Sequence, residues 1–170
     1  MILRGERVVL RPGTGDDLLR LVSIFREPEV ARRWGNPAEA EIREDFIDTE
    51  SGFVIELEGD VVGAIQYDEN DTPMYKSAGI DLFVTTARHG QGIGTDAVRT
   101  LARYLIGERG HHRITIDPAA DNAAAIRCYE KVGFRPIGVL RSYERGPDGS
   151  WHDGLLMDLL AAELKRVPSA

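Results

Sequence analysis

Three glycines at alternate positions, placed between two apolar stretches, constrain this chain more than any other feature. They are Gly90, Gly92 and Gly94. The apolar, β-branched run 79–84 before them predicts a buried strand, which only the charge of Asp81 interrupts. The run after them has apolar residues at helical spacing, namely Ile93, Ala97, Val98, Leu101, Ala102, Leu105 and Ile106. The sequence therefore predicts a strand, a glycine-rich turn and an amphipathic helix.

A glycine-rich turn before a helix favours the binding of an anion. Glycine has no Cβ, so backbone N–H groups converge and a ligand approaches closely. The start of the helix adds free N–H groups and the positive end of its dipole, which suit a phosphate. Arg88 and His89 add positive charge immediately before the glycines.

Several kinds of phosphate site have to be compared. A P-loop needs lysine before the final Ser or Thr, and Gly94-Thr95 has none, so a P-loop is excluded. A dinucleotide fingerprint needs a third glycine that is missing here. Asp117, at the end of the predicted strand 113–117, could replace the ribose-binding acid, so this interpretation stays open. A tight turn that binds nothing also stays open.

A second motif lies further along the chain. The stretch 121–134 predicts a helix, with Asx residues at its start and a glycine beyond its end. It resembles the signature Asn-x-x-Ala-x-x-x-Tyr-Glu-x-x-Gly-Phe of the acyl-CoA N-acyltransferases, the GNAT superfamily. The matching residues are Asn122, Ala125, Tyr129, Glu130, Gly133 and Phe134. The run 89–94 resembles that family's pyrophosphate loop, Gln/Arg-x-x-Gly-x-Gly/Ala, with His89 at the first position.

The resemblance implies acetyl-CoA as the co-substrate. Its pyrophosphate would lie on the glycine loop, its pantetheine arm along the strand, and Asn122 would bind that arm, although helix capping explains Asn122 equally well. The implied cofactor-binding residues are Phe83, Val84, His89, Gly90, Gln91, Gly92, Ile93, Gly94, Thr95 and Asn122.

Acetyl transfer to an amine requires three chemical contributions. Near pH 7 an alkyl amine is almost fully protonated, and overcoming this is worth about 4 kcal/mol. Asp81 is the candidate base, because a charge within an apolar strand needs a partner or a purpose; an Asp that faces solvent or pairs with Arg is the alternative. Backbone N–H groups of 82–84 would stabilise the oxyanion. The family uses a tyrosine at the position of Tyr129 to protonate the thiolate; the alternative is a tyrosine that packs in the core.

Trp34 and Asp117 are the candidate substrate-binding residues. Asp117 lies at the C-terminal end of a strand, where α/β folds place ligands. The aminoglycoside-modifying relatives have an acid in the matching Asp-Pro pair. Trp34 follows a predicted helix in a Gly/Asn/Pro loop, where it would form a pocket wall or cover the core.

The order of predicted elements defines the fold class. Strands are expected at 7–12, 53–57, 61–67, 79–84, 113–117, 134–140 and 151–159, with helices after 14, after 28, at 38–48, at 93–106 and within 121–134. This order predicts an α/β (α+β) fold with a mixed, mostly antiparallel sheet, a central β-α-β unit and helices on both faces. It resembles the GNAT fold over residues 1–170, which we expect to form a single domain.

Composition limits the remaining possibilities. The chain has 170 residues, of which 42% are hydrophobic, and a net charge of −7. These values suit a single globular domain and disfavour nucleic acid as a partner. The absence of an apolar run of membrane-spanning length or a signal peptide, together with a lone cysteine, predicts a cytoplasmic protein with no disulfide framework. We expect no membrane partner and a monomer or homodimer, between which the sequence does not decide. His111, His112 and His152 have no metal-ligand spacing, so no metal is expected.

The resemblance gives two signals about the acceptor. The segments 3–12 and 151–157 resemble enzymes that acetylate protein N-termini and ribosomal proteins. The middle resembles the aminoglycoside 6′-N-acetyltransferases at 79–81, 92–95, 117–118 and 125–131. We therefore expect an acetyl-CoA-dependent N-acetyltransferase that acts on a cationic, aminoglycoside-like small-molecule amine by direct transfer in a ternary complex. The alternatives are a protein N-terminal acetyltransferase and a non-catalytic acyl-CoA-binding module.

Overall fold

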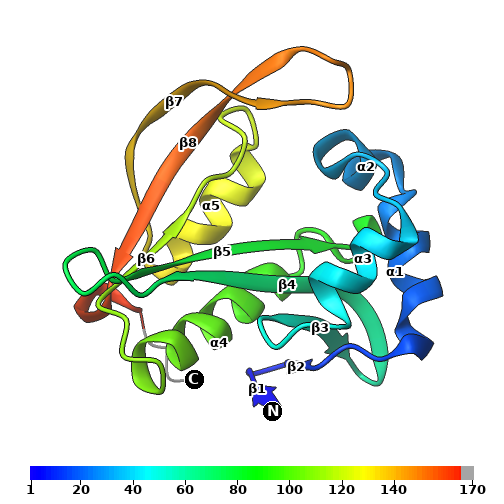
Figure 1. Cartoon of the computed structure of the whole chain (residues 1–170), viewed down its shortest axis with the longest axis horizontal. Coiled ribbons are helices and arrows are strands. Elements are labelled where there is room, and N and C mark those ends of the chain that lie inside the picture. The colour runs from blue at the N-terminus through cyan, green and yellow to red at the C-terminus, as the bar shows by residue number, and fades with distance from the viewer. Residues whose placement is uncertain (166–170) are drawn as a thin grey trace.

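The computed structural model describes residues 1–165, which form one mixed sheet of eight strands with helices on both faces (Figure 1). The strands are β1 (Leu3–Arg4), β2 (Val8–Arg11), β3 (Gly52–Leu57), β4 (Asp60–Asn70), β5 (Ser77–Val84), β6 (Arg113–Ile116), β7 (Arg135–Arg145) and β8 (Trp151–Leu160). Their order in the sheet is β1-β2-β3-β4-β5-β6-β8-β7. Neighbours are antiparallel except β5 and β6, which are parallel because a helix connects them.

Five α-helices cover the sheet. They are α1 (Leu18–Phe25), α2 (Pro28–Trp34), α3 (Glu39–Phe46), α4 (Ile93–Gly107) and α5 (Ala123–Val132), and short 3₁₀ turns lie at Gly15–Asp17, Thr86–Arg88 and Ala161–Glu163. The first three helices pack on one face of the sheet, and α4 and α5 pack on the other. In the described part of the chain, no helix is long and apolar enough to cross a membrane.

Strand alternation explains the two cores. Ile55 and Ile65 point towards α4, whereas Val54 and Ala64 point towards α1–α3. Successive strand residues face opposite sides of a sheet, so a strand covered on both faces reads as an unbroken apolar run. The mixed sheet and the two helical layers confirm the predicted fold class.

The sheet separates between β5 and β6. These strands pair at Ala78–Ile114 and Gly79–Thr115, and then β5 continues beside β4 while β6 continues beside β8. Residues 80–84 of β5 consequently have no strand partner on their second edge within the described chain. Figure 1 shows the opening between β5 and β6, with α5 alongside. A ligand reaching this opening meets free backbone groups.

The predicted elements agree with the structure except near three boundaries. The short strand β1 was not expected, and β4 extends to Asn70, beyond the expected strand 61–67. The strand expected to end near Leu140 continues to Arg145, because the register of β7 shifts between Leu140 and Glu144 and then resumes. This extension carries the β7–β8 hairpin over the opening in the sheet.

Candidate active site

The glycine turn between β5 and α4 forms a cradle. Gly90 and Gly92 have φ values of +72° and +81°, in the left-handed region that favours glycine. A Cβ at either position would meet no protein atom within 4 Å, so the space in front of the loop is open. Gly92 is the N-cap of α4, and the first free N–H groups of this helix therefore face the same opening. His89 contacts the Val84 carbonyl oxygen through Nε2 at 2.8 Å, which ties the loop to β5.

A buried carboxylate anchors this loop from behind. Asp96 is 4% exposed and accepts hydrogen bonds from the backbone N–H groups of Glu6, Arg7 and Val8 at 2.8–3.0 Å. The Arg7 guanidinium donates to the Gln91 carbonyl oxygen at 2.8 Å. Sequence reasoning missed Asp96. An acidic residue among the buried positions of a helix was the available signal, because such a group needs partners.

The glycine loop opens into a cleft of about 360 Å³. The charged residues that line the cleft are mainly basic: Glu29 is acidic, whereas the others are Arg33, Arg88, Arg127 and Lys131. The predicted residues Phe83, Val84, His89, Gly90, Gly92, Ile93, Gly94, Thr95 and Asn122 all line this cleft. Gln91 belongs to the loop but does not line the cleft, and its side-chain amide donates to the Ala87 carbonyl oxygen. A cradle without Cβ atoms, a helix N-terminus and excess positive charge together fit the pyrophosphate of acetyl-CoA.

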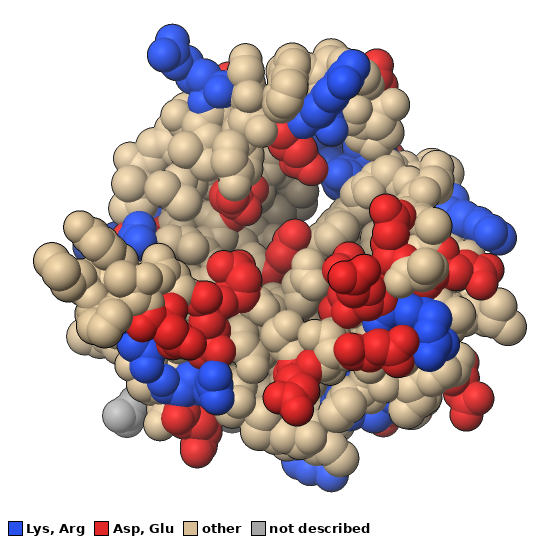
Figure 2. Space-filling model, in the orientation of Figure 1, with Lys and Arg blue, Asp and Glu red and all other residues tan. Residues whose placement is uncertain are grey.

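A second chamber of about 550 Å³ adjoins the cleft. The two share Arg33, Trp34, Leu82, Asn122 and Tyr129, so they are continuous, and Tyr129 lies where they meet. The charge of the second chamber is mainly acidic, from Asp81, Asp117 and Glu144. Figure 2 shows acidic side chains gathered around the hollow in this face of the molecule.

Asp81 lies on the unpaired edge of β5, and one carboxylate oxygen accepts a hydrogen bond from the Leu82 N–H at 3.0 Å. Solvent reaches the side chain, yet protein surrounds it within the chamber. This partial desolvation, with a further contribution from the negative charge of Asp117, raises the pKa of Asp81 to about 7. A carboxyl group with that pKa exchanges a proton readily at neutral pH.

The free edge of β5 supplies backbone donors. The Thr85 N–H donates to the Val62 carbonyl oxygen at 2.7 Å, so the backbone groups of Thr85 face β4. Alternate residues point their backbone groups to opposite edges, so the N–H groups of Leu82 and Val84 face the opening. Asp81 accepts the first of these, and the second remains available to a ligand.

Tyr129, on α5, is 8% exposed, and its ring packs against Phe134 at a centroid separation of 6.2 Å. Because it lines both the cleft and the acidic chamber, the packed tyrosine also reaches the ligand space. Burial, followed by the charges of Cys128, Asp81 and Asp117, raises the pKa of Tyr129 well above its ordinary value. The phenol is consequently protonated at neutral pH and is able to donate.

Cys128 is half-buried, contacts the Thr95 hydroxyl through its sulfur at 3.2 Å and lines the cleft. Burial raises the pKa of the Cys128 thiol, which keeps it protonated and weakly nucleophilic.

Asp117 follows β6, and the Tyr143 hydroxyl donates a hydrogen bond of 2.5 Å to it. Both residues also line a third cavity of about 600 Å³, together with Asp68 and Asp81. Sequence reasoning missed Tyr143, which lies in the part of β7 beyond the predicted strand.

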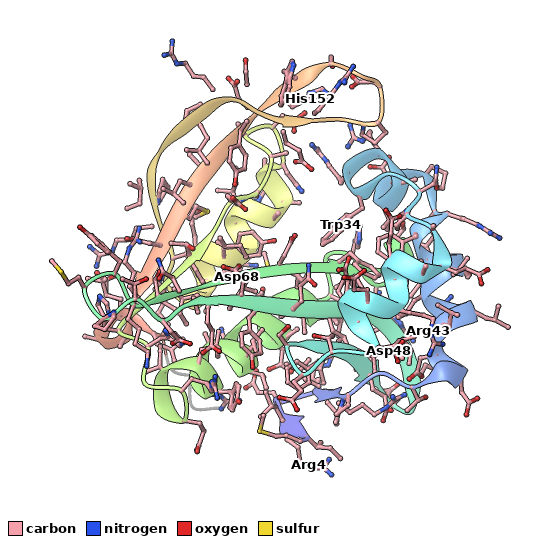
Figure 3. All side chains as sticks on the ribbon, in the orientation of Figure 1. Arg4, Trp34, Arg43, Asp48, Asp68 and His152 are labelled. Carbon is pink, nitrogen blue, oxygen red and sulfur yellow. The ribbon has the colours of Figure 1, made fainter. Side chains whose placement is uncertain are left out.

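Trp34 serves in both of the ways that its sequence context suggested. Its ring lies 5.9 Å from Phe25, 5.4 Å from Phe83 and 6.4 Å from Phe46 by ring centroids, in edge-to-face contacts that stabilise the core under α2. It also lines the cleft and the acidic chamber. Figure 3 shows Trp34 at the end of α2, reaching towards β5, with Asp68 on the neighbouring part of the sheet.

Asn122 acts as a cap in the structure. Its side-chain oxygen accepts a hydrogen bond of 3.2 Å from the Ala125 N–H at the start of α5. It also lines the cleft and the acidic chamber, so capping orients a side chain whose NH₂ group still faces the ligand space.

Two features lie beside the acidic chamber, next to its lining residues Arg33 and Trp34. Arg33 of α2 forms an ion pair of 2.5 Å with Asp121 in the loop between β6 and α5. The tip of the β7–β8 hairpin reaches the end of α2, where a Cβ on Gly35 would lie 3.8 Å from Pro147. These contacts narrow the entrance for a bulky acceptor.

Comparison with known proteins agrees with this geometry. A family model described as an acetyltransferase (GNAT) domain matches residues 7–135. Aminoglycoside N(6′)-acetyltransferase type 1 of Klebsiella pneumoniae is 28% identical over 166 residues, which cover 85% of this chain and 80% of the relative.

Solved structures extend the comparison to bound ligands. AAC(6′)-Ib in complex with paromomycin and acetyl-CoA aligns with a TM-score of 0.75 at 27% identity, over 96% of this chain and 99% of that one. RimJ of Mycobacterium smegmatis in complex with CoA-disulfide aligns with a TM-score of 0.76 at 25% identity, over 98% and 88%. The glycine cradle, the opened sheet and the family match lead to one conclusion: the chain belongs to the GNAT acetyltransferase family and is an acetyl-CoA-dependent acetyltransferase.

Proposed function

We propose that the protein acetylates a primary amine of a cationic, aminoglycoside-like small molecule. The observation that carries this proposal is the position of Asp81 on β5: it lines the acidic chamber next to Leu82, which lines both this chamber and the basic cleft. A cationic acceptor is attracted by Asp117 and Glu144 and brings its amine to Asp81. The relatives named for aminoglycoside acetylation support this acceptor class.

In this proposal acetyl-CoA supplies the acetyl group as a thioester, and the protein's residues hold the reactants and move protons. The cradle of Gly90 and Gly92 binds the pyrophosphate at the start of α4. The Val84 N–H, on the free edge of β5, donates to the pantetheine arm or to the thioester oxygen as negative charge develops there.

Two side chains handle the protons. Asp81 accepts a proton from the bound ammonium, which its pKa of about 7 allows at neutral pH, and the neutral amine then attacks the thioester carbon. Tyr129, protonated in the same range, donates a hydrogen bond to the departing sulfur. Tyr129 lines both chambers and Asp81 lines the acidic chamber beside Leu82, so transfer takes place directly from one bound reactant to the other. The protonated thiol of Cys128 argues against a covalent acetyl-enzyme.

Acetylation of a protein N-terminus is the second candidate, favoured by the likeness to RimJ over 98% of the chain. A peptide needs a groove that continues beyond the reacting amine. We expect the Arg33–Asp121 ion pair, and Pro147 near Gly35, to limit the space for such a groove on the α2 side. The enclosed chamber therefore favours a small acceptor.

The test is a turnover screen that detects released CoA thiol, with kanamycin, spermidine and N-terminal peptides as acceptors. We expect turnover with kanamycin to exceed turnover with every peptide. We also expect intersecting initial-rate lines and full activity in Cys128→Ala, as direct transfer requires. Asp81→Asn is the control for background hydrolysis. Efficient acetylation of peptides with no turnover of kanamycin or spermidine would contradict the proposal.

A further inference from the structure

A break in the β7–β8 ladder occurs next to the acidic chamber. Leu140 pairs with Gly154 and Glu144 pairs with His152, so three residues of β7 stand opposite one residue of β8. Ser142, in the middle of this bulge, has a φ of +47°, which is uncommon for a residue other than glycine. Its N–H donates to the Asp153 carboxylate at 2.8 Å, which holds the unusual conformation. Bulges of this kind redirect side chains near functional sites.

The side chain that this bulge redirects is Tyr143. Its ring lies over Gly154, where a Cβ would approach a ring carbon to 2.9 Å, so glycine leaves the space that the ring occupies. Its hydroxyl donates to the Asp117 carboxylate at 2.5 Å. This hydrogen bond, together with burial and the charge of Asp117, raises the pKa of Tyr143 to about 12, which keeps the phenol a donor.

Tyr143 also stands between two cavities. It lines the acidic chamber of about 550 Å³ and the cavity of about 600 Å³ that contains Asp68. Its side chain is 49% exposed, although a tyrosine with a purely structural role usually buries its ring. Because Tyr143 lines both cavities, part of its exposed surface borders the space where an acceptor would lie.

We propose that Tyr143 determines acceptor specificity. It is a positioning residue: its hydroxyl fixes Asp117 so that one carboxylate oxygen faces an ammonium group of the acceptor. Its ring offers an apolar wall to the carbon skeleton of the same molecule. The matching ligand is a compact molecule with at least two ammonium groups on a ring or short aliphatic frame, one at Asp81 and another at Asp117. This proposal rests on the proposed function.

The first experiment compares Tyr143→Phe, which keeps the ring and removes the hydroxyl, with the parent enzyme. We expect KM for kanamycin to rise about 3-fold, because Asp117 keeps its charge but loses the hydrogen bond that orients it. We expect kcat to change less than KM, and KM for acetyl-CoA to stay the same. Tyr143→Ala should raise KM further, because the wall is also lost. Tyr75→Phe is the matched control, since Tyr75 is 68% exposed and lines none of the three cavities of the site.

The second experiment tests whether Tyr143 acts through Asp117. In an Asp117→Ala background, Tyr143→Phe should no longer change KM, because the acceptor of its hydrogen bond is gone. Calorimetry of kanamycin binding to the enzyme–CoA complex should give the same non-additive pattern in Kd. Ring-labelled tyrosine, with Tyr143 assigned by its loss in Tyr143→Phe, should titrate at lower pH in Asp117→Ala than in the parent.

The outcomes separate the two proposals. An unchanged KM in Tyr143→Phe, or an equal increase in the Asp117→Ala background, would overturn the role of Tyr143 while leaving the acetyltransferase assignment intact. A parent enzyme that neither binds nor acetylates any diamine or amino sugar would overturn the proposed acceptor class, and the role of Tyr143 with it.

Discussion

The two halves of the active-site cleft recognise their ligands by different means. The basic half uses the backbone: two open glycines, the start of α4 and the free edge of β5. The acidic half uses side chains from separate elements, including Asp81 on β5, Asp117 after β6 and Tyr143 on β7. Backbone recognition of a cofactor needs a short local pattern, whereas side-chain recognition of an acceptor needs distant residues to be brought together. The identity of the cofactor can therefore be predicted from one sequence motif, whereas the identity of the acceptor cannot.

The largest effect should come from Asp81→Asn, which removes the proposed base from the acidic half of the cleft. We expect kcat to fall about 10³-fold, with the Kd of acetyl-CoA unchanged by calorimetry. Asp71→Asn, in the connection between β4 and β5, is the control and should match the parent. Parent-like turnover of Asp81→Asn, with chemistry limiting, would exclude Asp81 as the base.

The pH profile tests the same group without mutation. A base must be ionised, so kcat/KM of the parent should rise as the pH increases through about 7, the pKa of Asp81 in the free enzyme. The profile is measured in buffers of constant ionic strength. A rate that is flat between pH 6 and 8 would remove the proton-accepting role from Asp81.

A smaller loss is expected for Tyr129→Phe. A thiolate with a reference pKa of about 8.5 departs more easily than an alkoxide, so removal of the hydroxyl should slow kcat about 10²-fold. The ring packing against Phe134 is retained, so the melting temperature should stay within a few degrees of the parent value. Single-turnover kinetics give the chemical rate, and an unchanged rate would assign Tyr129 to the core alone.

The third substitution acts on the basic half. Gly92→Val places a side chain in the open space of the cradle, so the Kd of CoA should rise about 10-fold or more while the protein remains folded. The left-handed backbone at this position adds strain, which the control must reproduce. Gly110→Val is suitable, because Gly110 has a φ of +72° and the same open surroundings outside the cleft. Equal CoA affinity in both variants would remove the loop from the binding site.

The fourth substitution acts on the acidic half. Asp117→Asn should raise KM for kanamycin about 5-fold and lower kcat less, the pattern of lost uniform binding. The increase should shrink at high salt, because ions screen the attraction between the carboxylate and the acceptor. Asp60→Asn, at the start of β4 and outside the acidic chamber, is the control. A fall in kcat without a change in KM would place Asp117 in the chemical step instead.

The smallest effect concerns stability. The pKa of Asp81 is raised in the folded state, so the parent loses stability as the pH rises from about 4 to about 7 and the carboxylate ionises among neighbouring acids. Asp81→Asn should therefore melt at a higher temperature than the parent at pH 8, and the difference should vanish near pH 4. A constant difference across this range would mean that ionisation of Asp81 is not its cause.

Local patterns predicted most of the fold. The glycine cradle, the cap at Asn122 and the apolar alternation of β4 are readable because each depends on nearby residues. The sequence also predicted that Asp81, Tyr129 and Trp34 contribute to one site, and all three line the acidic chamber. That prediction came from the resemblance to a family rather than from spacing alone. Their roles in catalysis and binding stay predictions.

The parts that the sequence did not reveal depend on non-local geometry. Tyr143 reaches Asp117 because a bulge centred on Ser142 changes the register of β7. The sequence has no glycine at this position from which the bulge could have been predicted. The Arg33–Asp121 ion pair joins residues 88 positions apart. Side chains that meet in this way leave no periodic signal, so neither this ion pair nor the part played by Tyr143 was predicted, although Asp117 itself was expected to bind the substrate.

The attachment of the N-terminus to Asp96 has a consequence for synthesis of the chain. The three backbone N–H groups that this carboxylate accepts lie 88, 89 and 90 positions earlier in the sequence. During translation the segment 6–8 leaves the ribosome long before its anchor exists. The segment 6–8, which leads from β1 into β2, can therefore form these hydrogen bonds only after α4 has left the ribosome. Growing chains halted before residue 96 should expose this segment to protease, and chains long enough to release α4 should protect it.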